Sequence, residues 1–363
     1  MFEGRLPVAG PLPLNARCAN LRQFPVFVET LICSQPGRLH IAQLPAPTRL
    51  PGHALIRPRR IGLCGTDYHI FEGTHPFLQY PRVMGHELAV EVVDVPDKSD
   101  FAVGEICVVN PYLSCGTCIA CRAGKPNCCT RISVLGVHQD GGMAGLLSVP
   151  LRNLVHAAGL SADACATVEF LSIGAHAVRR GGVHDGHRVL VVGAGPIGLG
   201  AALFARLAGG NVSVLDMDPE RLAAVPALTG ASALPVADTP RDAVASATDG
   251  DGFDVVFDAT GNARAMQAGF DFVAHGGTYV LVSVVKDPIT FQDPDFHRKE
   301  MTLMGSRNAT AEDFERVIAA IRNGDVPVNR IITHRTSLSG AVETIPVWAH
   351  QKSGLIKAVI EID

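Results

Sequence analysis

The chain has 363 residues, of which 47% are hydrophobic and 18% are charged, and its formal net charge is −4. This length exceeds one comfortable core, so we expect two domains, and the composition excludes a disordered chain. The sequence has no long basic run, no apolar run of membrane-spanning length and no basic-then-apolar signal peptide. We therefore expect a cytoplasmic protein whose partners are small molecules, with neither nucleic acid nor a membrane among them.

The first half of the chain predicts a β-domain preceded by an extension. Residues 1–25 are rich in proline and show no clear period, so we expect a loose N-terminal extension, or else an arm packed at a subunit contact. From residue 26 to about 150, short segments rich in Val, Ile and Leu alternate with Gly and Pro. This spacing predicts an all-β, barrel-like domain. Residues 161–180 are predicted to be helical and to lead into a second domain.

The second half alternates predicted strands with predicted helices. Strands separated by helices imply right-handed crossovers and a parallel sheet, and hence an α/β domain. Pro226 is expected to kink or shorten the helix that follows Asp218. The strand near residues 277–285 is a candidate edge strand that would pair across a subunit boundary. The predicted strands cover residues 188–192, 211–215, 253–257, 277–282 and 354–362, and the predicted helices cover 196–207, 311–323 and 341–350.

Four of the ten cysteines lie in one short loop, with the spacing Cys115-x2-Cys118-x2-Cys121-x7-Cys129. In a chain without a secretion signal, clustered cysteines favour a metal over disulfides. Four thiolates close the tetrahedral shell of a structural zinc ion and leave no position for water. Cys128 is the rival fourth ligand, and an iron–sulfur cluster fits the same ligand type. We favour zinc held through Cys129.

A second group of residues has the composition of an open, catalytic zinc site. Such a site takes three protein ligands and keeps one exchangeable position. Cys64 follows a strand-like segment, and His86 follows a turn at Gly85. The third ligand is either the adjacent Glu87 or Glu169, which comes from a distant segment at the domain junction. We favour Glu169, with Glu87 behind it or exchanging with it.

The segment Gly193-Ala-Gly195-Pro-Ile-Gly198 follows a predicted strand and opens a predicted helix. Its glycines permit a tight turn, a close approach of pyrophosphate to the backbone, and close packing of helix and strand. The helix N-terminus then presents unpaired N–H groups to phosphate. Asp216 ends the next strand about twenty residues on, where a carboxylate binds ribose hydroxyls. Asp216 would repel a 2′-phosphate, so the pattern predicts NAD rather than NADP.

With these motifs, residues 26–363 resemble the zinc-dependent medium-chain alcohol dehydrogenases. The stretches 132–142, 258–261, 295–300 and 304–310 are similar to the polyol and sugar-acid branch of that family. The resemblance implies a GroES-like β-barrel catalytic domain at residues 26–170, completed by residues 309–363. It also implies a Rossmann domain, with a doubly wound parallel sheet, at residues 171–308. Relatives are dimers or tetramers, so we expect a homo-oligomer.

The resemblance also implies roles for individual residues. Thr66 would hydrogen-bond the substrate oxygen, His69 would pass its proton to solvent, and Asp67 would orient the histidine ligand. Zinc as a Lewis acid would lower the pKa of the alcohol, and the alcohol carbon would give a hydride to NAD. The catalytic zinc would be held by Cys64, His86 and Glu169 with Glu87 nearby, and the structural zinc by Cys115, Cys118, Cys121 and Cys129. Cofactor contacts would come from Gly193, Gly195, Pro196, Ile197, Gly198, Asp216 and Thr260.

The expected substrate is the secondary hydroxyl of a polyol or of a hexonate such as L-gulonate or L-galactonate. A carboxylate on the substrate would need a cation, for which Arg307, Arg298 and Lys299 are the candidates. The alternatives are a sorbitol-type, threonine or simple-alcohol dehydrogenase and, more distantly, a non-catalytic zinc-stabilised nucleotide-binding protein. One departure from the branch is that Phe170 follows Glu169, where proline is common.

Overall fold

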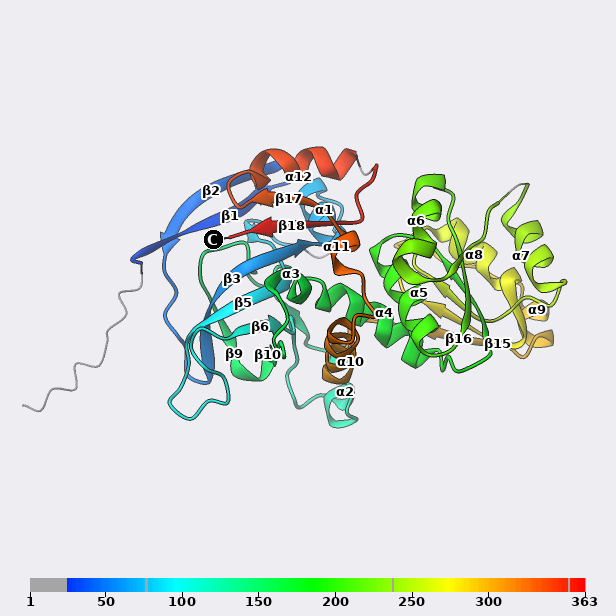
Figure 1. The fold of residues 1–363 in the computed structure, drawn as a ribbon, viewed down its shortest axis with the longest axis horizontal. Helices are drawn as coiled ribbons and strands as arrows, with labels where there is room; N and C mark the ends of the chain where they lie inside the picture. Colours follow the sequence, from blue (N-terminus) through cyan, green and yellow to red (C-terminus); the bar gives the residue numbers. More distant parts are fainter. Residues whose placement is uncertain (1–24, 76–77, 237, 352, 363) are drawn as a thin grey trace, which may run out of the picture.

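The computed structural model describes residues 25–75, 78–236, 238–351 and 353–362. The predicted N-terminal extension lies, apart from residue 25, outside the described residues. Two lobes lie side by side, with the helix α4 (Val168–Arg180) between them (Figure 1). We call them the β lobe, which is built mainly on antiparallel strands, and the parallel-sheet lobe.

The β lobe contains a seven-stranded sheet in the order β10-β6-β5-β3-β18-β17, with β9 paired to β3, and a three-stranded sheet in the order β2-β1-β4. Most side chains of β3 and β5 are buried, which explains their runs of Val, Ile and Leu. The predicted strands of this half are therefore confirmed. The bounds are β1 (Phe27–Gln35), β2 (Arg38–Pro45), β3 (His53–Leu63), β4 (Arg82–Val83), β5 (Glu87–Asp94), β6 (Ile106–Val109), β9 (Leu147–Pro150), β10 (Leu154–His156), β17 (Ile332–Ser337) and β18 (Lys357–Glu361).

The end of the described chain returns to the β lobe. Strand β18 pairs with β3 in antiparallel register, from Ala358 opposite Leu63 to Glu361 opposite Arg60. The sheet therefore contains strands from both ends of the sequence. The remaining elements of this lobe are α1 (Gly65–Glu72), β7 (Tyr112–Leu113), α2 (Ile119–Arg122), η1 (Pro126–Cys128), β8 (Ser133–Val134), η2 (Leu151–Asn153), α3 (Ala162–Cys165), α11 (Val328–Ile331) and α12 (Ala341–His350).

The parallel-sheet lobe has six strands in the order β13-β12-β11-β14-β15-β16, which is the doubly wound arrangement. The central strand β11 is a continuous apolar run because helices cover both faces of the sheet. The elements are β11 (Arg188–Val192), α5 (Pro196–Leu207), β12 (Asn211–Leu215), α6 (Pro219–Thr229), β13 (Ser232–Ala233), α7 (Pro240–Thr248), β14 (Phe253–Asp258), α8 (Ala263–Phe272), β15 (Val273–Leu281), α9 (Asp293–Arg298) and β16 (Thr302–Gly305). Helix α10 (Ala311–Arg322) packs against α4.

One sequence-based expectation for this lobe is wrong, and of the two effects expected of Pro226, a kink or a shortened helix, the shortening is not seen. The strand expected near residues 277–285 is not at the sheet edge, because the short strand β16 pairs along its outer side. Pro226 does not shorten α6, which continues to Thr229 and closes at Gly230 with a left-handed φ of 69°. Proline this near a helix end removes one backbone hydrogen bond, while buried Leu222 and Val225 keep the helix packed on the sheet.

Candidate zinc and dinucleotide sites

Cys64 on one segment and the consecutive residues His86 and Glu87 on another meet in the β lobe. One ligand atom from each lies within 4.8 Å of the other two. Cys64 follows the end of β3 and caps the N-terminus of α1, while His86 immediately precedes β5. The turn between β4 and β5 uses Gly85 at a φ of 93°, a conformation that favours glycine. The predicted convergence of residues 64 and 86 is therefore present.

Asp67 is hydrogen-bonded to both of the segments that carry Cys64 and His86. Its buried carboxylate accepts hydrogen bonds from the backbone N–H of Cys64 at 2.9 Å and of Gly85 at 3.3 Å. One of its oxygens lies 3.9 Å from His86 Nδ1. Burial lowers the pKa of His86, but the negative charges of Asp67, Cys64 and Glu169 outweigh it and raise that pKa. The imidazole therefore sits in a strongly electronegative environment, which also favours a metal cation.

The two candidate carboxylates have different partners. Both oxygens of Glu87 accept hydrogen bonds from Lys357 Nζ, at 2.7 and 2.8 Å. A Cβ at Gly62 would lie 2.1 Å from Glu87 Oε2, so glycine leaves the room that this carboxylate occupies. Glu169 Oε1 accepts a hydrogen bond from the Tyr112 hydroxyl. Glu169 Oε2 is buried and has no hydrogen-bond partner in the described part of the chain.

These observations favour different third ligands. Interatomic distance groups Glu87, and not Glu169, with Cys64 and His86. Donor availability favours Glu169, because its free oxygen is buried and because Lys357 already engages Glu87. Burial and the nearby Glu87 raise the pKa of Glu169, and a bound cation would relieve that cost. We give more weight to the unsatisfied oxygen, because a buried carboxylate oxygen without a partner is rare in a folded protein.

Lys357 is buried to 1% exposure on β18, where it also donates to the Leu63 carbonyl at 3.1 Å and stacks over the Phe170 ring at 4.2 Å. We expect Lys357→Met to destabilise the protein by about 3–5 kcal/mol, because Glu87 becomes a buried charge without a partner. The double variant Lys357→Met/Glu87→Gln should recover much of this loss. Denaturant titration measures the free energies of unfolding, with the exposed Lys98→Met as a control. Equal stability of Lys357→Met and the parent would contradict this account.

The residues of the predicted proton path lie between this site and the surface. Thr66 Oγ1 is 3.7 Å from Cys64 Sγ and is half-buried. His69, on the exposed side of α1, lies 3.0 Å from Thr74 Oγ1 through its Nδ1 atom. Its ring is also 3.6 Å from the Glu72 carboxylate. Thr66 is thus the member nearest the thiol, and His69 is the exposed member on the same helix.

The four cysteines of the loop form a second candidate metal site. Ligand atoms of Cys115, Cys118, Cys121 and Cys129 lie within 4.8 Å of one another, whereas Cys128 is exposed and outside this group. Backbone N–H groups, first that of Thr117, lower the pKa of Cys115 to about 5. The N–H of Cys121 is the largest of the groups that lower the pKa of Cys118 to about 6. The donor set of four thiols, two of them stabilised as thiolates, fits a structural zinc ion.

The glycine-rich segment has the geometry that a dinucleotide needs. Gly193 turns the chain at a φ of 101°, and a Cβ at Gly198 would lie 1.8 Å from the Gly193 carbonyl oxygen. Gly195 caps α5, and no heavy atom lies within 4 Å of a Cβ placed there, so pyrophosphate has space. Pro196 and Ile197 form the first turn of the same helix.

The two predicted polar contacts of the cofactor follow β12 and β14, the strands on either side of β11. Asp216, after β12, accepts hydrogen bonds from the N–H groups of Ala194 at 2.6 Å and Asp218 at 2.8 Å. Thr260, after β14, donates to Asp258 at 2.8 Å. Both lie at the carboxyl end of the parallel sheet, beside the glycine-rich turn, where ligands bind in open α/β sheets.

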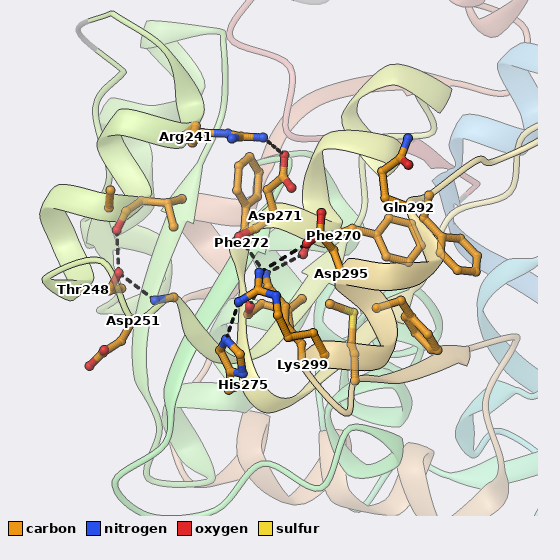
Figure 2. A pocket seen from close by; sticks show the side chains of 18 of the residues that line it. Arg241, Thr248, Asp251, Phe270, Asp271, Phe272, His275, Gln292, Asp295 and Lys299 are labelled. Carbon is orange, nitrogen blue, oxygen red and sulfur yellow. Dashed lines mark hydrogen bonds and ion pairs between the residues drawn. The ribbon is translucent and has the colours of Figure 1, made fainter.

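The predicted substrate cations are divided between opposite ends of that sheet. Arg298 and Lys299 precede β16 and line a 630 Å³ pocket at the amino end of β14, β15 and β16. Figure 2 shows Lys299 among the side chains of this pocket. Lys299 Nζ donates to three backbone carbonyls, and Arg298 pairs with Asp295. These two residues therefore lie at the end of the sheet opposite the glycine-rich turn, because they precede β16, a strand that the sequence analysis did not predict. Arg307 follows β16 and lies at the carboxyl end.

Sequence reasoning missed Tyr112 and Lys357. Lys357 carried a signal, since it is the one lysine within the apolar run of residues 355–360. A buried lysine in a strand needs a carboxylate partner, although the sequence does not say which. Tyr112 carried no such signal. The phenol approaches Glu169 only because β7 lies against the start of α4.

The comparisons with known proteins agree with this architecture. The model for the alcohol dehydrogenase GroES-like domain matches residues 50–159, and that for the zinc-binding dehydrogenase domain matches residues 196–323. The chain belongs to the zinc-dependent medium-chain alcohol dehydrogenases, and it is therefore an oxidoreductase with a zinc ion and a nicotinamide cofactor. In the described residues, no helix is long and apolar enough to cross a membrane.

Individual relatives cover nearly the whole chain. L-galactonate-5-dehydrogenase of Escherichia coli K12 is 42% identical over 335 residues, which is 92% of this chain and 98% of that protein. The alcohol dehydrogenase RspB of E. coli CFT073, solved with NADH, has a TM-score of 0.87 and 28% identity and covers 93% of this chain and 100% of that one. A zinc-binding dehydrogenase of Sinorhizobium meliloti 1021, solved with NADP, has a TM-score of 0.84 and 26% identity. The match covers 93% of this chain and 99% of that one.

Proposed function

We propose that this protein oxidises a secondary hydroxyl of a sugar acid, or of a polyol, and transfers the hydride to NAD. The observation that carries the proposal is the convergence of Cys64, His86 and a buried carboxylate in a family whose second lobe binds a nicotinamide cofactor. The likeness to an L-galactonate-5-dehydrogenase supports a hexonate such as L-galactonate or L-gulonate. Sorbitol, threonine and simple alcohols are the alternative substrates.

We assign the catalytic zinc to Cys64, His86 and Glu169, with Glu87 held by Lys357. The buried, unpartnered Glu169 Oε2 supports this choice over Glu87, which stays the alternative third ligand. Cys115, Cys118, Cys121 and Cys129 would hold the structural zinc. When bound, the catalytic zinc supplies Lewis acidity that lowers the pKa of the substrate hydroxyl, and the nicotinamide accepts the hydride.

The protein's own residues have three tasks in this proposal. Thr66 hydrogen-bonds the substrate oxygen and takes its proton, which His69 passes to water on the exposed side of α1. Asp67 holds the segments of Cys64 and His86 in register through backbone hydrogen bonds, and its negative charge favours the metal-binding environment of the imidazole. These roles rest on the positions of the groups, from the half-buried thiol of Cys64 to the exposed imidazole of His69.

For the cofactor, we propose that Gly193, Gly195, Gly198 and the first turn of α5 hold the pyrophosphate. Thr260 would face the cofactor from the end of β14. Asp216 keeps lone pairs free beyond its two backbone contacts, and these would accept the ribose hydroxyls. The same carboxylate would repel a 2′-phosphate, which favours NAD over NADP.

The domain bounds and the assembly are also proposals. We place the catalytic domain at residues 26–170 and 309–363, and the Rossmann domain at 171–308. The pairing of β18 with β3 supports the return of the last segment. We propose a homo-oligomer, a dimer or a tetramer, in which the outer edge of β16 is available for pairing between subunits.

A substrate panel tests the proposed function. We expect NADH formation with L-galactonate or L-gulonate, weaker turnover of sorbitol, and little with threonine or ethanol. NAD should exceed NADP by at least about tenfold in kcat/KM, equivalent to about 1.4 kcal/mol. Absorbance at 340 nm measures each rate at saturating zinc. Turnover confined to threonine or ethanol would assign the enzyme to a different branch, and no turnover of any member would reject the proposal.

A further inference from the structure

Two cations of the parallel-sheet lobe lie at the rim that faces the β lobe. Lys286 follows β15 and Arg307 follows β16, so both extend from the carboxyl end of the sheet, the end that also carries the glycine-rich turn. Lys286 Nζ crosses between the lobes and donates to the Thr74 carbonyl at 3.0 Å. Thr74 Oγ1 is itself 3.0 Å from His69 Nδ1. Lys286 is therefore adjacent to the predicted proton path.

Arg307 belongs to the same electrostatic neighbourhood. After burial, the charge of Arg307 is the largest influence that lowers the pKa of His138. His75 also has a lowered pKa, caused by burial and then by His138, His69, Lys286 and His86. Arg307 and Lys286 extend from the same end of the sheet, because β15 and β16 are parallel neighbours and both residues follow the carboxyl ends of these strands.

Neither cation is neutralised by the protein. Among the described residues, Lys286 and Arg307 have no ion-pair partner, and both side chains are exposed. Many other arginines pair with a carboxylate, as Arg59 does with Glu91 and Arg335 with Asp163. In a chain of net charge −4, two unpaired cations at the same end of the parallel sheet create a local positive field that attracts an anion.

The position of Arg307 is fixed by the four-cysteine loop. Asn127 lies in η1, between Cys121 and Cys129, and it is 4% exposed. Its side-chain amide donates to the Arg307 carbonyl at 3.0 Å, and its own carbonyl accepts from Asn308 Nδ2 at 3.1 Å. The segment is constrained further because Asn308 has a left-handed φ of 52°.

The side-chain amide of Asn127 is also held by a hydrogen-bonded pair of residues on α4 and α10. Asn127 Nδ2 lies 3.1 Å from His176 Nε2 on α4, and His176 Nδ1 lies 2.8 Å from the buried carboxylate of Asp313 on α10. The loop of the structural metal, α4 and α10 therefore hold the backbone of Arg307 at one place. This rigidity suits recognition of a ligand group at a fixed position, because the protein loses little conformational entropy when the ligand binds.

We propose that Lys286 and Arg307 form a carboxylate site that selects a sugar acid over a neutral polyol, with Asn127 as the positioning residue for Arg307. The inference rests on the proposed function and adds the determinant of its substrate class. A guanidinium binds a carboxylate through two parallel hydrogen bonds, and the lysine adds a second positive charge.

The test compares an acid with a neutral substrate in four variants. In Arg307→Met and Lys286→Met we expect KM for L-galactonate or L-gulonate to rise about tenfold or more. KM for sorbitol should change less than about twofold, and kcat should change little for either substrate. Arg307→Lys should recover part of the loss. Arg298→Met, at the opposite end of the sheet, is the matched control and should leave every constant unchanged.

Asn127 is tested through its dependence on Arg307. Asn127→Ala should raise KM for the acid while the chain retains two zinc ions, and it should add nothing further when Arg307 is already Met. Equal losses for acid and polyol in the Arg307 and Lys286 variants would overturn the carboxylate site while leaving the proposed function intact. A wild-type enzyme that oxidises polyols but no acid would also overturn it. Failure of the wild type on every sugar acid and polyol rejects the proposed function itself.

Discussion

Cys64→Ser is expected to reduce kcat by about 10³-fold or more while the protein stays folded. The thiol sits at the start of α1 among groups that converge on one point, and the site loses its softest donor when oxygen replaces sulfur. Lewis acidity contributes several kcal/mol to transition-state stabilisation, and about 4 kcal/mol corresponds to about 10³-fold. Steady-state kinetics measures the loss, and metal analysis should show one zinc per chain instead of two.

The control for this experiment is Cys128→Ser. Cys128 is exposed and outside both groups of metal-ligating residues, so this variant should keep full activity and two zinc ions. Undiminished turnover of Cys64→Ser would exclude catalysis at this site. If Cys64→Ser loses activity but retains both zinc ions, the thiolate contributes to catalysis without being required for metal binding.

The second large effect is expected from Cys129→Ser. Cys129 is the one buried member of the four-cysteine group, and its sulfur accepts N–H hydrogen bonds from Cys115 at 3.3 Å and Arg131 at 3.4 Å. Structural zinc binding contributes about 10–16 kcal/mol in small metal-folded domains, and we expect a loss of about 4 kcal/mol or more here because the rest of the lobe has its own core. That corresponds to a fall in Tm of about 10 °C.

Differential scanning calorimetry and metal analysis check this prediction. The expected product keeps the catalytic zinc and loses the structural one, which is the converse of Cys64→Ser. Asn127 lies between Cys121 and Cys129 and hydrogen-bonds to the Arg307 carbonyl. Loss of the structural zinc should therefore also raise KM for a sugar acid, while measurable turnover remains. A Tm equal to that of Cys128→Ser, with two zinc ions still bound, would show that Cys129 is not a ligand.

The sequence was most informative where one segment determines its own structure. The bounds of β11, α5 and β12 were predicted to the residue, because a buried apolar run, a glycine turn and a proline at the helix start each act locally. The four-cysteine group was predictable for the same reason, since its ligands lie within one loop. Such signals do not depend on how distant segments pack.

Prediction was incomplete where segments far apart in the chain decide the outcome. The choice between Glu87 and Glu169 depends on Lys357, which approaches Glu87 only after β18 pairs with β3. The position of Arg298 depends on β16, a short strand that the sequence analysis did not predict. Because Arg298 precedes this parallel strand, it lies at the amino end of the sheet, whereas Arg307 follows the strand and lies at the carboxyl end.

The pairing of Glu87 with Lys357 has a consequence for how the enzyme is made. The two residues are separated by 270 positions, so a ribosome polymerising about 5–20 residues per second needs roughly a quarter of a minute to a minute between them. Throughout that interval the nascent chain carries an acidic side chain destined for the interior without its counter-charge. The charge environment around Glu87 is therefore complete only when translation has passed β18 and this strand has paired with β3.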